Sequence, residues 1–504
     1  MDFSSTTLSP LDCAVLGSLI SCCGELEELV LPKTELTPEC ISRLAPGLSC
    51  CRHVNLDTCH LTSTCCSALS SALSSQQSRL TELNLRNNNL EDSGVNQLCE
   101  GLRSENCKLE KVNLGTCHLT ITCCSALSSV LSSPHSRLTE LDLSSNNNLE
   151  DSGVSQLCVG LRSENCKLEK LRLSGCRLTS KCCSALSSAL SSTHSRLTDL
   201  ELSKNNMEDS GVVQLCEGLM SENCKVEKLS LSSCGLSSTC CSALSSALSS
   251  PNTRLIELDL SFNKHLEDSG VAQLCEGLRS ENCKLEKMNL SSCGLTSKCC
   301  SALSSALSSL HSQLTELKVN GNIMRDSGVD QLCEGLRSEN CRLEKLSLSD
   351  CHLTSKCCSA LSSVLSSPNS QLTELHLGKE NVEKSEEKNC LDYSGVAQLC
   401  EGLMNENCKL KKLDLSSCGL VSRCFTAFSS ALSSPHSRLT ELDLSENDMG
   451  DQGLPQLYEG LRSENCKLEK LKLWDNKISD NEKKNLSSLQ EELNKTGWQV
   501  EIIT

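Results

Sequence analysis

One short pattern, L-x-x-L-x-L, returns along almost the whole chain and limits what the chain can fold into. From Cys51 onward its copies begin 29 or 30 residues apart, except for one interval of 38 residues between Leu372 and Leu410. Two repeat types alternate, and residues 138–167 and 168–196 typify them. A fixed period of this length indicates a solenoid, in which each repeat buries its apolar face on its neighbours.

Each repeat changes from strand periodicity to helix periodicity near its middle. The leucines within residues 80–85 mark a short strand, and the apolar residues of 95–102 fall at i, i+3, i+4 and i+7, which is helical spacing. Asp92 and Ser93 stand where this helix should begin and are expected to cap it. Every repeat should therefore supply one strand and one helix.

Stacking such repeats side by side predicts a curved molecule. Neighbouring strands lie about 4.8 Å apart, whereas packed helices need about 8–10 Å, so the sheet must take the inner side of the bend. We predict an α/β solenoid of about 16–17 repeats, a right-handed horseshoe with a parallel concave sheet and convex helices. Residues 1–25 should form a helix that caps the first strand, and residues 26–504 the solenoid, with an insertion near residues 379–390.

The unusual composition fits this fold and excludes several classes of protein. The chain of 504 residues has 40 cysteines and only 8 aromatic residues, and the cysteines follow the repeat register instead of a pairing scheme. They are therefore expected to be reduced packing thiols in a cytoplasmic protein. The net charge of -17 argues against a nucleic-acid partner, and no apolar run of about 18 residues implies a membrane span.

Six vicinal cysteine pairs are candidates for redox sensitivity. The first cysteine of each pair falls near an expected helix N-terminus, where the thiolate is favoured. Oxidation of these pairs is expected to unfold the solenoid. The pairs are Cys65 and Cys66, Cys123 and Cys124, Cys182 and Cys183, Cys240 and Cys241, Cys299 and Cys300, and Cys357 and Cys358.

The expected inner surface offers candidate residues for partner binding. Counting the first leucine of the pattern as position one, positions three and five of each strand should face the concave side. Position three alternates between acid and base, which indicates either a ladder of cross-strand ion pairs or a recognition stripe. The residue type at position five varies between repeats, which is expected either of a position that determines partner specificity or of one under neutral drift. The candidates on the concave face and rim are Asp142, Arg172, Glu201, Asp259, Lys318, His376, Asp443, Tyr458, Lys472, Trp474 and Asp475.

The sequence carries no motif for catalysis, metal binding or a cofactor. No phosphate-binding loop, H-E-x-x-H or G-x-S-x-G motif occurs, and no Cys-x-x-Cys pair has a second ligand pair at zinc spacing. We therefore predict a non-enzyme with no cofactor and no metal. The insertion near residues 379–390 follows a strand and is either a binding loop or a tolerated surface insertion.

The pattern L-x-x-L-x-L-x-x-[N/C]-x-L, in two alternating types, resembles the leucine-rich repeats of the ribonuclease-inhibitor type. The repeat sequences DSGVxQLCEGLRSENCKLEKL and LTSKCCSALSSALSS are most similar to the C-terminal repeat region of NOD-like receptors of the NACHT, LRR and PYD family, particularly the fish-type members. The resemblance implies the ligand-recognition or autoinhibitory part of an innate immune receptor, or a stand-alone relative, with protein partners.

Two other functions remain open at this stage. One is inhibition of pancreatic-type ribonucleases, because residues 471–475 (Leu-Lys-Leu-Trp-Asp) resemble the L-x-L-Tyr-Asp setting that ribonuclease inhibitors use to engage the enzyme. Against it, tryptophans on the middle strands, which the inhibitors also use, have no counterpart here. The other is a passive repeat scaffold without a dedicated ligand.

Overall fold

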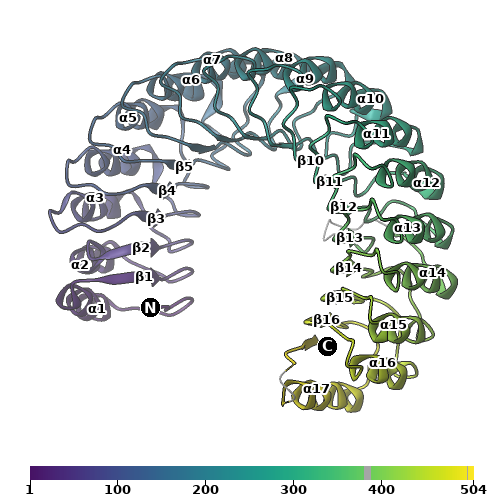
Figure 1. The fold of residues 1–504 in the computed structure, drawn as a ribbon. Helices are drawn as coiled ribbons and strands as arrows, with labels where there is room; N and C mark the ends of the chain where they lie inside the picture. Colours follow the sequence, from purple (N-terminus) through teal and green to yellow (C-terminus); the bar gives the residue numbers. More distant parts are fainter. Residues whose placement is uncertain (380–387, 496–497) are drawn as a thin grey trace. The chain divides into compact units, whose positions relative to one another are not determined.

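The computed structural model describes residues 1–379, 388–495 and 498–504. The chain divides into two compact units. The N-terminal unit comprises Met1–Leu236 with Ser250–Leu255, and the C-terminal unit comprises Ser237–Ser249 with Ile256–Thr504. Both are built from the same strand-and-helix repeat (Figure 1).

In the N-terminal unit, eight strands pair in parallel and in chain order. The strands are β1 (Leu26–Val30), β2 (Cys51–Asn55), β3 (Glu82–Asn84), β4 (Lys111–Asn113), β5 (Glu140–Asp142), β6 (Lys170–Arg172), β7 (Asp199–Glu201) and β8 (Lys228–Ser230). The helices are α1 (Pro10–Cys23), α2 (Pro38–Leu48), α3 (Cys66–Ser74), α4 (Glu91–Leu102), α5 (Ile121–Leu131), α6 (Glu150–Leu161), α7 (Cys183–Leu190) and α8 (Glu208–Leu219), with 3-10 turns η1 (Ser63–Cys65) and η2 (Ser180–Cys182).

In the described residues of the C-terminal unit, nine strands pair in the same way. They are β9 (Glu257–Asp259), β10 (Lys287–Asn289), β11 (Glu316–Lys318), β12 (Lys345–Ser347), β13 (Glu374–His376), β14 (Lys412–Asp414), β15 (Glu441–Asp443), β16 (Lys470–Lys472) and β17 (Glu501–Ile503). The helices are α9 (Cys241–Leu248), α10 (Glu267–Leu278), α11 (Cys300–Leu307), α12 (Arg325–Leu336), α13 (Cys358–Leu365), α14 (Tyr393–Leu403), α15 (Cys424–Ser433), α16 (Leu454–Leu461) and α17 (Asp480–Lys495), with 3-10 turns η3 (Ser238–Cys240), η4 (Ser297–Cys299) and η5 (Ser355–Cys357).

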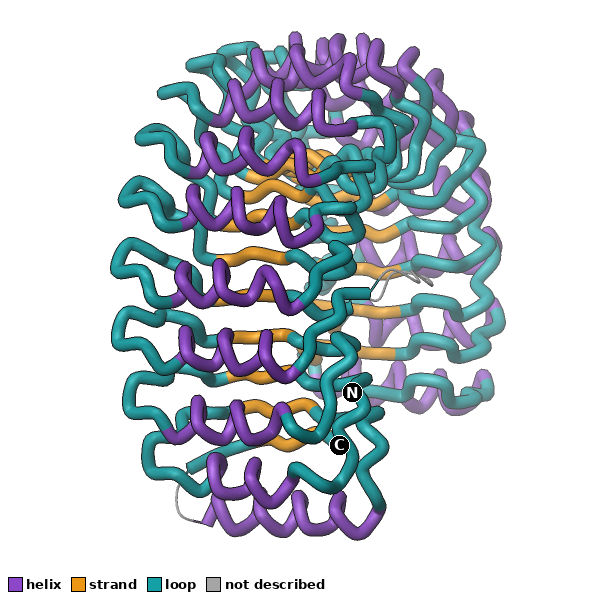
Figure 2. Tube along the Cα trace, turned by 90° about the vertical axis from the view of Figure 1, so that its right-hand side faces the viewer, coloured by secondary structure: helices purple, strands orange, loops and turns teal. Residues whose placement is uncertain are grey.

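Each unit has two layers with an aliphatic core between them. The strands line the inner side of the bend and the helices its outer side, and Figure 2 separates the orange strands from the purple helices. The central residue of every strand from β3 to β16 is buried. Leucines and cysteines supply most of this core, and Phe425 and Phe428 are its large aromatic residues. The predicted repeat solenoid, with a parallel sheet inside and helices outside, is confirmed.

From β3 to β15, a buried asparagine holds the turn that follows the strand in every second repeat. The Asn322 side chain is 2% exposed, and its Oδ1 accepts the backbone N–H groups of Cys293 and Leu295, each at 3.0 Å. Its Nδ2 donates to the carbonyls of Leu290 and Val319 at 2.9 and 2.8 Å. One amide therefore satisfies four backbone groups of two repeats, which water cannot reach.

The alternate repeats place a cysteine at the same position. The Cys293 thiol donates to the Leu260 carbonyl at 3.1 Å, and the Cys117 thiol donates to the Leu85 carbonyl at 3.2 Å. Both side chains are fully buried. This arrangement agrees with the expectation of a small packing thiol that acts as a weak donor.

The expected role of Asp92 as a helix cap is wrong. Helix α4 begins at Glu91, which has a φ of 55°, and no side chain caps it. The Asp92 carboxylate instead accepts the backbone N–H of Thr120 in the next repeat at 2.8 Å, together with its hydroxyl. The same clasp joins Asp268 to Thr296. The carboxylate therefore joins neighbouring repeats, a role that the local sequence does not reveal.

The first residues of the chain close one edge of the N-terminal unit. Asp2 forms a parallel bridge with Val30 of β1, and α1 follows it. Residue Gly17 of α1 packs so closely on α2 that an added Cβ would lie 2.7 Å from the Arg43 carbonyl oxygen. The opposite face of α1 is exposed, with Leu11 at 68% and Leu19 at 57%. Residues 1–25 thus supply a bridging segment as well as the expected helix.

The insertion lies after β13, where the interval between repeats is longest. Residues 380–387 lie outside the described residues. The repeat resumes at Asn389, which occupies the same turn position as Asn322; we call these turn asparagines the asparagine ladder. The Asn389 Oδ1 accepts the N–H groups of Cys351 and Leu353 at 3.0 and 2.9 Å. Its Nδ2 donates to the carbonyls of Leu348 and Leu377, each at 2.8 Å. The extra residues therefore leave the ladder uninterrupted.

Removing one ladder asparagine should destabilise the solenoid strongly. The substitution Asn322→Ala leaves buried N–H and C=O groups without partners, at about 1–3 kcal/mol for each unsatisfied group. We expect a loss of about 3 kcal/mol or more in the free energy of unfolding, measured by urea denaturation followed by circular dichroism. The control is Asn369→Ala, which removes one exposed hydrogen bond to the Arg337 carbonyl and should cost about 1 kcal/mol or less. Equal losses for the two variants would contradict this account.

Candidate protein-binding surface

Position three of the strands forms a ladder of cross-strand ion pairs. Lys111 lies 3.6 Å from Glu82, and Lys345 and Lys412 lie 3.1 and 3.7 Å from Glu374. Burial opposes ionisation of Glu374, but its contacts with the two lysines outweigh it and lower its pKa. Exposed pairs of this kind contribute about 0–1 kcal/mol each, so the stripe is largely self-neutralised.

Position five has a structural role in many repeats. The carboxylates of Asp142, Glu201 and Asp259 each accept a backbone N–H two residues further on, at 2.9 Å. Asp443 does the same with Ser445 at 3.1 Å. These acidic side chains end the strand and form the turn, so part of the predicted partner-binding set is already engaged within the fold. The sequence alone does not reveal this constraint.

The basic residues of position five are free of that turn bond. Arg172 pairs with Glu140, and Lys318 lies 3.5 Å from Glu316. His376 lies 3.5 Å from Asp414, and Lys472 lies 3.0 Å from Asp443. Their side chains are 29–42% exposed. These four residues are the position-five candidates whose polar ends are directed at their neighbours and at solvent.

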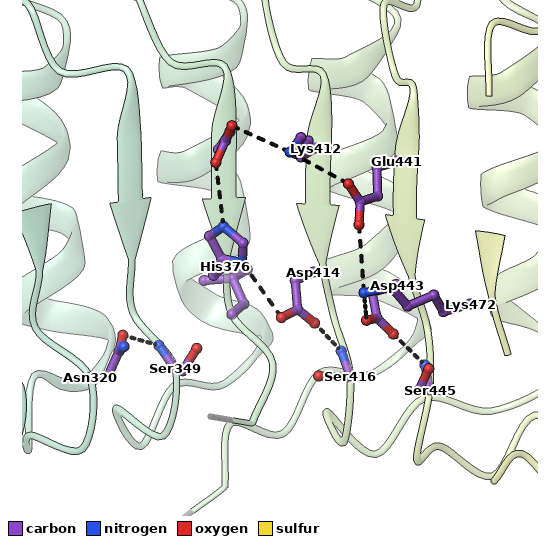
Figure 3. A network of polar contacts seen from close by, with 12 residues as sticks. Asn320, Ser349, His376, Lys412, Asp414, Ser416, Glu441, Asp443, Ser445 and Lys472 are labelled. Carbon is purple, nitrogen blue, oxygen red and sulfur yellow. Dashed lines mark hydrogen bonds and ion pairs between the residues drawn. The ribbon is translucent and has the colours of Figure 1, made fainter. Parts of the chain in front are cut away.

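The structure brings several of these candidates together on β11–β16. Lys318, Ser347 and His376 line a hollow of about 190 Å³ on the inner face. Figure 3 shows the network that continues from it, in which His376 points toward Asp414, and Lys472 toward Asp443 and Glu441.

The three candidates near the C-terminus separate into two places. Trp474 and Asp475 directly follow β16 on the rim, and Trp474 is 41% exposed. Tyr458 lies on α16, in the helical layer, and donates to the Glu482 carboxylate of α17 at 2.6 Å. Burial and this carboxylate raise the pKa of Tyr458. The placement of Tyr458 on the concave face or rim is therefore wrong, because its helix packs on the terminal helix.

The vicinal cysteines are buried, and the pKa of Cys123, near the start of α5, is raised where thiolate character was expected. Each of the twelve side chains is at most 1% exposed. Burial raises the pKa of Cys66 to about 12. A hydrogen bond to the neighbouring thiol, together with burial, raises the pKa of Cys123, whose thiol also donates to the Thr120 carbonyl at 3.2 Å. At Cys123 the hydrogen bond with Cys124 and burial therefore outweigh the proximity of a helix N-terminus, and sensitivity of the fold to oxidation stays a prediction.

Within the described residues, no three or more His, Cys, Asp or Glu side chains are arranged to hold a metal ion. Across the same part of the chain, no helix combines the length and hydrophobicity that a membrane crossing requires.

Sequence comparisons place the chain in a family. Family models described as "Leucine Rich repeat" match residues 78–99, 136–158, 164–187, 194–216, 252–275, 406–422 and 437–454, and a related model matches residues 342–364. The pig ribonuclease inhibitor is 38% identical over 420 residues, which cover 83% of this chain and 88% of the inhibitor. The chain belongs to the ribonuclease-inhibitor-type leucine-rich-repeat family.

This leucine-rich-repeat protein is also similar to receptors of much greater length. Human NACHT, LRR and PYD domains-containing protein 3 is 42% identical over 421 residues, covering 81% of this chain and 33% of the receptor. Human NACHT, LRR and PYD domains-containing protein 14 is 38% identical over 385 residues, which cover 28% of it. The chain thus spans about a third of the length of the receptors that it matches. The expected likeness to fish-type receptors stays a prediction.

The accessible thiols of this leucine-rich-repeat protein were missed by the sequence analysis. Cys22 and Cys23, at the end of α1, and Cys390, after the insertion, are exposed. Their positions in the sequence could have predicted this exposure, because Cys22 and Cys23 fall in the terminal helix and Cys390 falls outside the repeat pattern.

Thiol titration of the native protein should distinguish the two groups of cysteines. At pH 8, DTNB should react rapidly with 3 of the 40 thiols and with the others only after denaturation, because the other thiols are buried in the fold and out of the reagent's reach. Replacing Cys22, Cys23 and Cys390 by serine should abolish the rapid phase. Rapid labelling of Cys65 and Cys66, located by mass spectrometry, would show that the vicinal pairs are reactive in the folded protein.

Proposed function

We propose that this chain is a cytoplasmic protein-protein interaction module, the ligand-recognition or autoinhibitory repeat region of a NOD-like innate immune receptor or a stand-alone relative. The observation that carries the proposal is the 42% identity to NACHT, LRR and PYD domains-containing protein 3, which extends over 81% of the chain. Forty free cysteines support a reducing compartment.

The inner surface supports the use of the chain in protein binding. Strands hold the side chains of positions three and five in a fixed array, so little conformational entropy is lost when a partner binds. The near balance of charge along position three favours specificity over long-range attraction. Lys318, His376 and Lys472 are the residues that we propose to distinguish partners, since they do not form the turn. No catalytic role is proposed for any residue.

Sequencing of full-length transcripts tests the receptor proposal. The open reading frame should continue upstream of Met1 into a nucleotide-binding region, because the chain matches about a third of the receptors' length. A transcript with an in-frame stop codon shortly before Met1 would contradict the receptor form and favour a stand-alone relative.

Ribonuclease inhibition is a second candidate, and two observations favour it. The chain covers 88% of the pig inhibitor, and Trp474 with Asp475 follows β16 in a setting that resembles the inhibitors' L-x-L-Tyr-Asp. Titration of a cationic pancreatic-type ribonuclease should abolish its activity at near-stoichiometric protein if this function is retained, and Trp474→Ala should weaken the inhibition. Full ribonuclease activity at a tenfold excess of the protein would exclude it.

A further inference from the structure

One junction between repeats differs from the others. Asp326 of α12 clasps Thr354 of the following repeat: the Thr354 N–H and hydroxyl donate to its carboxylate at 2.8 and 2.7 Å. The corresponding positions of the next such junction, again 28 residues apart, hold Tyr393 and Val421. Both polar partners of the clasp are thus replaced together by an aromatic and an aliphatic residue.

The altered junction is exposed. Tyr393 and Val421 are 36% and 43% exposed, and the Arg423 guanidinium lies 5.1 Å from the centre of the Tyr393 ring. We call Tyr393, Val421 and Arg423 the junction patch. The chain has 8 aromatic residues, and few are as exposed as Tyr393, so an exposed tyrosine beside an arginine is a rare local feature here.

The backbone beneath the junction patch is fixed without the clasp. Asp392 caps α14 by accepting the Gly395 N–H at 3.1 Å. Asp392 also exchanges two hydrogen bonds with Ser355, each at 2.7 Å. Tyr393 and Val421 are therefore not needed to order the start of the helix, and they sit on a rigid base.

The charges around the junction patch indicate what it would bind. Within the described part of the chain, neither Arg423 nor Lys356, which lies next to Ser355, has a carboxylate at ion-pair distance. A carboxylate of a partner would complement Arg423, and an apolar side chain beside it would cover Tyr393 and Val421. Tyrosine and arginine are also the residue types that dominate interface energetics.

We propose that the junction patch is a docking surface for a partner protein segment that carries an acidic residue next to an apolar one. The proposal rests on the proposed function as an interaction module and adds a second surface, on the helix-start side of the repeats. The exposed aliphatic and aromatic area supplies affinity, and the pairing of Arg423 with the acidic residue supplies orientation.

The chain itself offers a variant that removes the junction patch and keeps the fold. Tyr393→Asp, Val421→Thr and Arg423→Lys together rebuild the clasp found between Asp326 and Thr354, with lysine at the position that Lys356 occupies. Its thermal midpoint should equal or exceed that of the parent protein, so loss of binding cannot be assigned to unfolding.

The probe is a phage-displayed library of random dodecapeptides, selected on the full chain and followed by affinity measurements on synthetic peptides. Enriched peptides should carry Asp or Glu beside Leu, Ile or Phe, and should lose at least tenfold in affinity with the triple variant and with Arg423→Glu. Peptides that retain full affinity for the triple variant would overturn the proposal.

Other outcomes separate this proposal from the proposed function. Peptides that lose affinity with Lys472→Glu but not with the triple variant would refute the junction patch and keep the interaction module. If peptides were enriched only on a variant that lacks residues 380–387, the occupant of the junction patch would be the chain's own insertion. A dimer seen by sedimentation and abolished by the triple variant would assign it to a second copy. No enriched peptide at all would count against both proposals.

Discussion

The buried turn after each strand is the feature on which the stack depends. Its backbone N–H and C=O groups lie between two repeats, away from water, and each unpaired group would cost about 1–3 kcal/mol. Asn322 and its equivalents satisfy these groups from two repeats at once. Because neighbouring repeats share the hydrogen bonds, each repeat is stable only beside the next, as in other solenoids. This also explains how the core can be aliphatic and thiol-rich with so few aromatic residues.

The same turn limits which surface residues are available for function. Where position five carries Asp142 or Asp259, the carboxylate ends the strand. The residue type at these positions is therefore constrained by the fold as well as by any partner. The basic residues at position five do not form this turn hydrogen bond, so the turn does not constrain their residue type. A similar distinction applies at the repeat junctions, where Asp326 and Thr354 form the hydrogen-bonded clasp while Tyr393 and Val421, at the corresponding positions, cannot. Departures from the repeat pattern at positions released from a structural role are thus where function is most readily placed.

Much of the fold could be predicted from the sequence, because periodicity reports burial directly. The strand-and-helix repeats and the buried leucines of the strands follow from spacing alone. Three features could not be predicted, since each depends on contacts between repeats. Asp92 bonds to Thr120 in the next repeat instead of capping its own helix, and Tyr458 bonds to Glu482 of α17. At Cys123, the hydrogen bond with Cys124 and burial raise the thiol pKa despite the nearby helix N-terminus. The role of position five in the turn could not be predicted either, because only the folded turn shows which backbone N–H its carboxylate accepts.

Amide hydrogen exchange in the native protein tests the central claim most directly. The account predicts that the amides of Cys293 and Leu295, which donate to Asn322, exchange as slowly as those of the neighbouring strands β10 and β11. The equivalent turns at Cys59, Cys117 and Cys176 should be protected alike, since each donates to an asparagine of the next repeat. Exchange of these turn amides at the rate of exposed loop residues would contradict the claim that the asparagine ladder holds the repeats together.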